Sequence, residues 1–116
     1  MNRAGVGLLA GTDLASSLTY PGFSLHDELA LLVEAGLTPM DALQTATRNP
    51  ARLLKRDDAG TIGTGKLADL VLLDANPLDD IRNTQRIQAV IFNGTLLDRR
   101  ALDGLLAATE QQAKEE

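Results

Sequence analysis

A two-residue pair near the C-terminus, Asn93-Gly94, constrains the fold more than any other feature of the sequence. The pair stands between two apolar runs in IQAVIFNGTLLD. Asn-Gly is the preferred pair for a type I′ turn, because both positions of that turn need a positive φ. The pattern predicts a β-hairpin. The apolar run Leu70–Leu73, within LADLVLLD, predicts a further strand before it.

The N-terminal half carries helix signals instead. SLHDELALLVEAG has apolar residues at helical spacing, with Ser24 as the predicted N-cap and Gly36 as the left-handed stop. TPMDALQTATRN also carries helix-start signals, with Thr38 as the N-cap and Pro39 at the first helical position. The two segments predict consecutive helices joined by a short break.

Two more helices complete the expected α+β fold. Asn49-Pro50 predicts the start of a short helix that runs through Leu54. The segment from Arg99 to Ala113 has Leu at helical spacing and predicts a C-terminal helix, whose end, EQQAKEE, is expected to be solvated and frayed.

Composition limits the classes of partner. The 116 residues are 44% hydrophobic and 23% charged, as expected for one globular domain. A net charge of −5 and only three aromatic residues disfavour nucleic acid and anionic membranes as partners. No apolar run reaches the length of a membrane span and the first residues make a poor signal peptide, so we expect a cytoplasmic protein. The absence of Cys excludes thiolate zinc sites and Cys nucleophiles.

Asp13 is the first candidate site residue. The stretch GLLAGTDLAS begins with an apolar segment, residues 4–10, that suits a buried strand, and Asp13 follows its end after Gly-Thr. Many α/β enzymes place catalytic carboxylates at such strand ends. An Asp in this position is equally able to cap a loop, so the residues alone leave both interpretations open.

His26 and a glycine-rich loop are the other candidates. His26 is the only His, so no multi-His metal site is available. It lies in the first turn of a predicted helix, either as a partly exposed helix-start residue or as a substrate-binding imidazole. GTIGTGKL, residues 60–67, matches a phosphate-binding loop except that Leu67 replaces the required Ser or Thr, and a strand rather than a helix follows. We therefore discount it as a P-loop.

The order of these segments resembles a known family. AGVGLLAGTD, then SLHDELALLVEAGLTPMDALQTATRNPARLL, then GTIGTGKLADLVLLDANPLDDIRNTQRIQAVIFNGTLLDR is similar to the C-terminal third of the metal-dependent amidohydrolases, in the imidazolonepropionase- and prolidase-like branch. The resemblance implies the last strand and helices of a (β/α)8 barrel over residues 1–55. It implies β-sandwich strands with the Asn-Gly hairpin over 56–98, and a C-terminal helix with a frayed tail over 99–116.

The resemblance also implies a chemistry. In this family the Asp at the end of barrel strand eight binds a metal and acts as general base toward the bridging water, and Asp13 stands in that position. A metal-bound water with a lowered pKa beside a carboxylate is a nucleophile at neutral pH. The implied parent enzyme hydrolyses C–N bonds of amides, cyclic amides or dipeptides with a divalent metal, zinc, as cofactor.

The sequence departs from the family in its metal ligands. The His-x-His of strand one, the bridging Lys or Glu of strand four and the His ligands of strands five and six have no counterpart here. We expect a piece of an enzyme or a truncated reading frame that lacks a complete metal site, has no metal cofactor of its own and is inactive by itself. The alternative is a non-catalytic domain that associates with itself. In either case we expect a homo-oligomer through exposed strand edges or helix faces.

Overall fold

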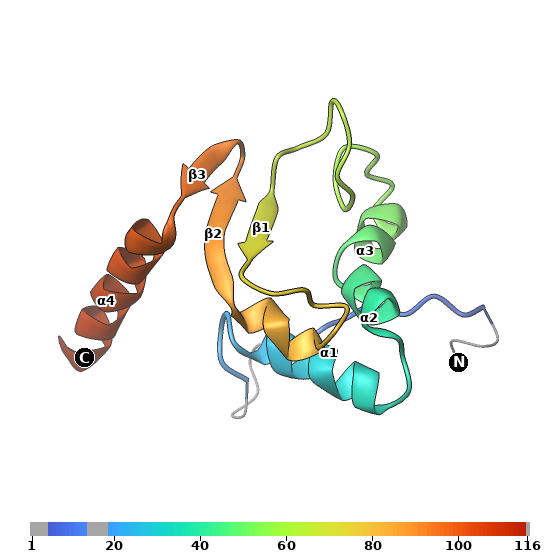
Figure 1. Cartoon of the computed structure of the whole chain (residues 1–116), viewed down its shortest axis with the longest axis horizontal. Coiled ribbons are helices and arrows are strands. Elements are labelled where there is room, and N and C mark those ends of the chain that lie inside the picture. Colours follow the sequence, from blue (N-terminus) through green and yellow to red (C-terminus); the bar gives the residue numbers. More distant parts are fainter. Residues whose placement is uncertain (1–4, 14–18, 116) are drawn as a thin grey trace.

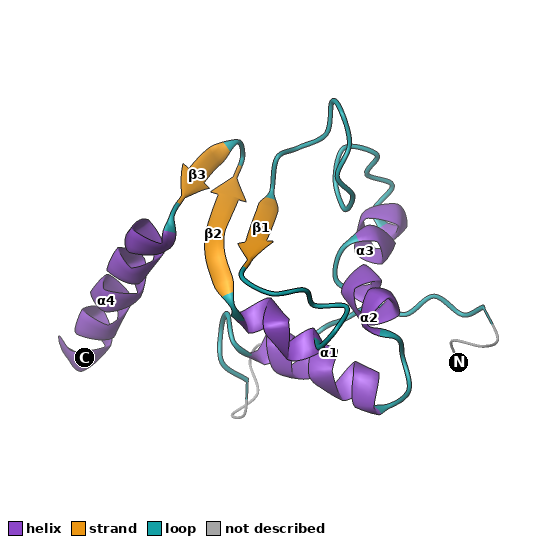
Figure 2. Ribbon diagram, in the orientation of Figure 1, coloured by secondary structure: helices purple, strands orange, loops and turns teal. Residues whose placement is uncertain are grey.

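The structure, a computed structural model, describes residues 5–13 and 19–115 and has an α+β architecture (Figure 1). The elements in chain order are α1 (Ser24–Glu34), α2 (Pro39–Thr45), α3 (Arg48–Leu53), β1 (Leu70–Leu73), the 3-10 helix η2 (Ile81–Gln85), β2 (Ile87–Phe92), β3 (Thr95–Leu97) and α4 (Arg99–Glu115). In Figure 2, α1, α2 and α3 lie on the β1 side of the small sheet, and α4 lies on the β3 side.

The sheet has three antiparallel strands in the order β1-β2-β3. The predicted hairpin is confirmed, because Phe92 pairs with Thr95 across the turn and both turn residues have positive φ, 47° for Asn93 and 80° for Gly94. The backbone N–H of Asn93 also donates to Oδ1 of Asp69 at 2.7 Å. The residue before β1 thus joins the turn to the neighbouring strand.

Local hydrogen bonds set the ends of the first two helices. α1 ends at Glu34, and Gly36 (φ 105°) follows the C-cap residue, Ala35. The Gly36 N–H donates to the carbonyl of Val33, while the Leu37 N–H donates to the carbonyl of Leu32. These two bonds form the complete glycine stop that the sequence predicts. The Thr38 side chain accepts from the Asp41 N–H at 3.1 Å, which confirms Thr38 as the N-cap of α2.

The predicted N-cap of α1 is wrong. Phe23 occupies the cap position and Ser24 is the first helical residue. The Ser24 hydroxyl binds the preceding loop instead, where it donates to the Tyr20 carbonyl and accepts from the Tyr20 N–H. A hydroxyl committed to the loop is not available to the amides of the first helical turn.

The core lies among α1, α2 and η2. Leu29, Ala42 and Ile81 form one buried cluster, against which partly buried apolar side chains of α1 and α2 pack. Ile81 comes from the connection between β1 and β2, so this cluster ties the helices to the sheet.

The predicted strand over residues 4–10 is not formed in the part that the structure describes. Residues 5–13 run beside the helices without regular secondary structure, and residue 4 lies outside the described residues (Figure 2). A strand exists only through a ladder of hydrogen bonds to a neighbouring strand. The described sheet pairs only β1, β2 and β3, so this segment has no ladder to join.

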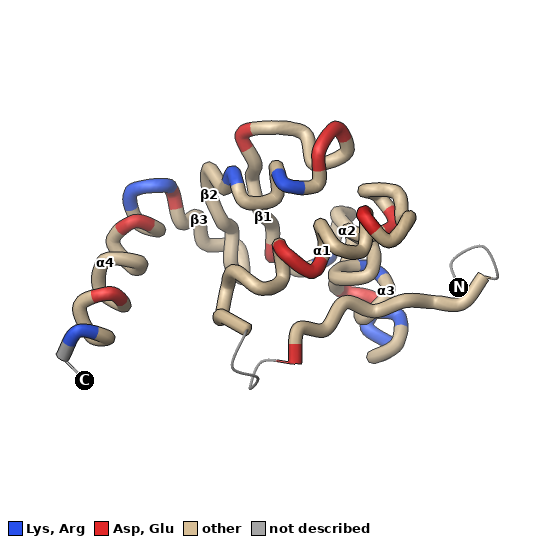
Figure 3. The backbone as a smooth tube through the Cα atoms, turned by 90° about the horizontal axis from the view of Figure 1, so that it is seen from below, with Lys and Arg blue, Asp and Glu red and all other residues tan. Residues whose placement is uncertain are grey.

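The C-terminal helix extends further than predicted. α4 continues to Glu115, through the segment expected to fray, and Lys114 forms an ion pair with Glu110 one turn before it. Basic positions lie near both ends of this helix, with acidic positions between them (Figure 3). The contact of α4 with the sheet is at its start, where Arg99 donates to the Ile87 carbonyl at 2.7 Å.

Candidate functional site

The segment that carries Asp13 is fixed to the helices by separate hydrogen bonds. The Ala10 N–H donates to the Thr45 carbonyl at 3.0 Å, at the C-terminal end of α2. The Asn49 side-chain amide donates to the Leu8 carbonyl at 2.9 Å. Each bond satisfies one backbone group that a sheet would otherwise pair, and α2 gains a donor for one of its free terminal carbonyls.

Glu28 supplies the attachment nearest to Asp13. The Gly11 N–H donates to its Oε1 at 2.7 Å, two residues before Asp13. The other carboxylate oxygen, Oε2, is buried and accepts no hydrogen bond from the residues described. A buried carboxylate oxygen without a donor is costly, so this atom marks a position where a further donor would be stabilising.

Sequence reasoning did not select Glu28. A Glu in an amphipathic helix normally faces solvent, and no motif singles it out. The available signal is its register, because Glu28 lies three residues after Leu25 and four before Leu32, on the apolar side of α1.

Asp13 ends the segment on an exposed turn. Its φ is 50°, in the left-handed region that Asp tolerates better than most residues. The side chain is exposed, and its backbone carbonyl accepts from the Thr19 hydroxyl at 3.4 Å.

His26 joins α1 to η2. Its Nδ1 lies 3.0 Å from the Thr84 hydroxyl oxygen, and that hydroxyl donates to the Ile81 carbonyl at 2.9 Å. Thr has a single O–H proton, so Nδ1 must be the donor to Thr84. One ring nitrogen therefore serves this contact, and no hydrogen bond connects His26 to Asp13 in the part of the chain that the structure describes. Its substrate-binding role stays a prediction.

The described residues do not fit a complete metal site. Within residues 5–13 and 19–115, no three His, Asp or Glu side chains come close enough together to hold an ion. Catalytic zinc normally takes three protein ligands and a water. Asp13 can supply one of them. In the same part of the chain, no helix has both the length and the apolar character needed to cross a membrane.

Comparison with known proteins identifies the class. The sequence profile of the amidohydrolase family matches residues 1–97, which include Asp13, all three N-terminal helices and the hairpin. The chain belongs to the amidohydrolase family.

Individual relatives agree with this assignment. An imidazolonepropionase of Pyrobaculum arsenaticum is 40% identical over 74 residues, 64% of this chain and 18% of that protein. An ochratoxinase of Aspergillus niger is 39% identical over 92 residues, 76% of this chain and 18% of that protein. The crystal structure of a putative prolidase from Bifidobacterium longum superposes with a TM-score of 0.76 at 36% identity, over 92% of this chain and 28% of that one. An Xaa-Pro dipeptidase with methionine in its active site gives a TM-score of 0.74 at 36% identity, over 84% and 23%.

These matches cover most of this chain but only a small share of each relative. The chain spans 18% or less of the first curated relatives it matches. The similarity therefore describes one part of those enzymes.

Proposed function

We propose that this chain is the C-terminal portion of an amidohydrolase that hydrolyses C–N bonds in amides, cyclic amides or dipeptides. The observation that carries the proposal is the family match across the Gly-Thr-Asp segment and the helices that hold it. The names of the relatives favour this class, since imidazolonepropionase, ochratoxinase and prolidase are among them.

In the proposed parent the chain divides into three parts. Residues 1–55 are the end of the barrel, residues 56–98 are strands of the small sandwich, and residues 99–116 form the C-terminal helix. The absence of a strand over residues 5–13 is consistent with this division, because a barrel strand needs neighbours on both sides to form its ladder.

Asp13 is the proposed metal ligand and general base. A divalent ion, zinc, would supply an activated water to the complete site. Since the described residues do not gather a ligand set, we assign no hydrolytic step to this chain alone. Within the chain, the Glu28–Gly11 hydrogen bond fixes the backbone that presents Asp13.

The test combines zinc calorimetry with amide and dipeptide hydrolysis, on the wild type and on Asp13→Ala. We expect weak zinc binding and no hydrolysis by this chain. In a complete parent we expect Asp13→Ala to lower turnover by at least about 10³-fold while the fold persists, because a ligand and a general base are lost together. Sub-micromolar zinc binding that Asp13→Ala removes would show that the chain builds a metal site by itself. Unchanged turnover in the parent variant would remove Asp13 from the mechanism.

A second candidate is a self-associating, non-catalytic domain. It is favoured by the apolar surface of the sheet, where Val71 is 56% exposed and Phe92 is 66% exposed, and by β1 and β3, the two edges of the described sheet. Open edges and contiguous apolar surface favour association of chains. We expect a homo-oligomer by size-exclusion with light scattering. A 12.3 kDa monomer at high micromolar concentration would contradict this candidate and leave the first intact.

A further inference from the structure

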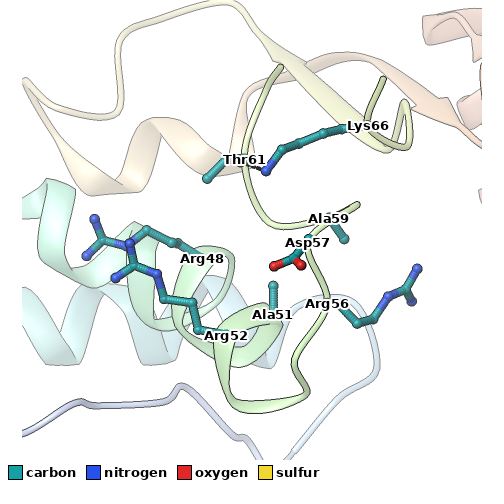
Figure 4. A pocket seen from close by; sticks show the side chains of 8 residues that line it. All are labelled: Arg48, Ala51, Arg52, Arg56, Asp57, Ala59, Thr61 and Lys66. Atoms are coloured by element: carbon teal, nitrogen blue, oxygen red, sulfur yellow. Dashed lines mark hydrogen bonds between the residues drawn. The ribbon is translucent and has the colours of Figure 1, made fainter. Parts of the chain in front are cut away.

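A cavity of about 280 Å³ lies between α3 and the loop of residues 55–66, away from Asp13 (Figure 4). Its polar lining is mainly basic. Arg48 and Arg52 extend from α3 and Lys66 extends from the far side of the loop, while Asp57 lies below Lys66 in this view, to the right of both guanidinium groups. The basic residues of α3 also stand out in Figure 3, in a chain whose net charge is −5.

The walls of the cavity are held by close backbone packing. Gly60 has a φ of 81°, and a Cβ on it would lie 2.6 Å from the Ala51 Cβ and 2.8 Å from the Thr47 carbonyl oxygen. Only glycine allows the loop to approach α3 so closely. The Arg56 N–H also donates to the Ala51 carbonyl at 2.8 Å. The loop is therefore fixed against the helix, and the cavity is formed before any ligand binds.

One of the lining cations is already neutralised. The Arg56 guanidinium donates to both carboxylate oxygens of Asp58, at 2.9 and 2.7 Å, and its side chain points away from the cavity (Figure 4). The remaining cations have no such partner. Among the described residues, no carboxylate lies within ion-pair distance of Arg48, Arg52 or Lys66.

The lining also contains an unsatisfied donor. Nε of Arg48 is buried, and no described residue accepts a hydrogen bond from it. Arg48 and Arg52 lie one turn apart on α3, an arrangement of like charges that destabilises a helix unless an anion binds between them. Three cations face the single carboxylate of Asp57, so the cavity carries two excess positive charges.

We propose that this cavity binds a doubly charged phosphate group, as inorganic phosphate or a small phosphate monoester. Guanidinium groups match phosphate oxygens with paired N–H donors, and the excess charge matches a dianion. The volume lies just below the ~300 Å³ at which pockets for drug-sized ligands begin, which suits a small anion. The binding mode differs from the discounted P-loop, because side chains of α3 and Lys66 bind the anion and no helix follows the loop.

Titration of the ¹⁵N-labelled 116-residue chain with inorganic phosphate, followed by NMR at constant ionic strength, tests the proposal. We expect saturable shifts at residues 48–66. We expect weaker binding near pH 5.5 than near pH 7.5, because inorganic phosphate and its monoesters gain their second negative charge as the pH rises between these values. Glycerol phosphate as a second ligand distinguishes a monoester site from one that admits only the free ion, and acetate serves as the singly charged control.

Three substitutions are expected to change the affinity for phosphate in different ways. Arg52→Gln removes an exposed cation and is expected to weaken phosphate binding about tenfold. Asp57→Asn removes the repelling carboxylate and is expected to tighten binding about threefold. Arg100→Gln makes the same charge change on α4 and should leave binding unaltered. Shifts reproduced by sodium chloride or acetate, or equal losses in Arg52→Gln and Arg100→Gln, would overturn the proposal.

Discussion

The segment of residues 5–13 and the β2–β3 hairpin are both apolar and glycine-containing, yet only the hairpin forms strands. The hairpin brings its own partner, because the two runs pair across Asn93-Gly94 within a dozen residues. The segment of residues 5–13 is held instead by hydrogen bonds that it makes with Glu28, Thr45 and Asn49, which lie far along the chain. β structure is therefore a property of a pair of segments, and apolar composition alone does not produce it.

The two segments also differ in the role that we assign to them, one in the stability of the fold and the other in function. The hairpin is specified by residues close together in the sequence, and it contributes two strands to the sheet. The segment of residues 5–13 carries the proposed catalytic carboxylate, and its position depends on single contacts with other elements. Sites commonly lie on such segments, since a binding residue needs access that a paired strand in a core does not give.

The largest expected effect is on the contact that holds the N-terminal segment. Glu28→Ala removes the acceptor for the Gly11 N–H. A hydrogen bond to a charged group contributes about 1.5–3 kcal/mol, so we expect exchange of the Gly11 amide to become at least about tenfold faster. Hydrogen exchange measured by NMR gives the rate, with amides of β2 as the internal reference.

Glu28→Gln provides the matched control. Its side-chain oxygen still accepts from Gly11, while an amide NH₂ replaces the unsatisfied Oε2. We expect slow exchange at Gly11 to be restored. Equal exchange in the Ala and Gln variants would show that Glu28 does not fix this segment, and equal acceleration in β2 would mean that the whole fold has loosened.

The same distinction explains what the sequence could and could not predict. The type I′ turn, the glycine stop at Gly36 and the Thr38 cap depend on residues within a few positions of one another, and all are confirmed. The expected strand over residues 4–10 and the Ser24 cap depend on what surrounds them in space. Both predictions are wrong in the described residues for that reason.

The candidate site follows the same rule. Asp13 could be selected as a candidate because it follows an apolar segment and Gly-Thr, and the structure shows that its side chain is exposed. The Glu28–Gly11 and His26–Thr84 contacts join residues 17 and 58 positions apart. Such pairs have no signature in a single sequence, because helix periodicity shows which face a side chain occupies and leaves its partner unspecified.

A smaller effect is expected at the turn of the hairpin. Gly94→Ala places a Cβ on a residue with φ of 80°, which costs about 1 kcal/mol of unfolding free energy. Nothing lies within 4 Å of the new Cβ, so the loss is purely conformational. Urea denaturation should show a lower midpoint at an unchanged slope.

Gly104→Ala is the matched control, and it is expected to raise the stability where Gly94→Ala lowers it. Gly104 lies inside α4 with open space around its Cβ, and Ala is favoured over Gly in a helix by up to about 1 kcal/mol. We expect helicity by circular dichroism to rise. A gain in stability from Gly94→Ala would contradict the local origin that we assign to the hairpin.

The smallest expected effect is the contribution to stability of an ion pair in the loop that leads from α3 to β1, and this contribution depends on pH. The Arg56 guanidinium, through its hydrogen bonds to Asp58, holds the pKa of that carboxyl below its ordinary value of 3.8. A carboxyl with a lowered pKa in the folded state stabilises the fold fully above its ordinary value. That contribution is lost as the pH falls through the lowered value.

Both side chains are 49% exposed, so the contribution is small. We therefore expect Asp58→Asn to lower the melting temperature slightly near neutral pH, and the difference should shrink as the pH falls through the lowered pKa and the wild-type carboxyl gains a proton. Gly11 exchange should be unaffected at neutral pH, because the loop and the N-terminal segment are held by different residues; a penalty that persists in acid would mean that Asp58 acts through packing and not through its charge.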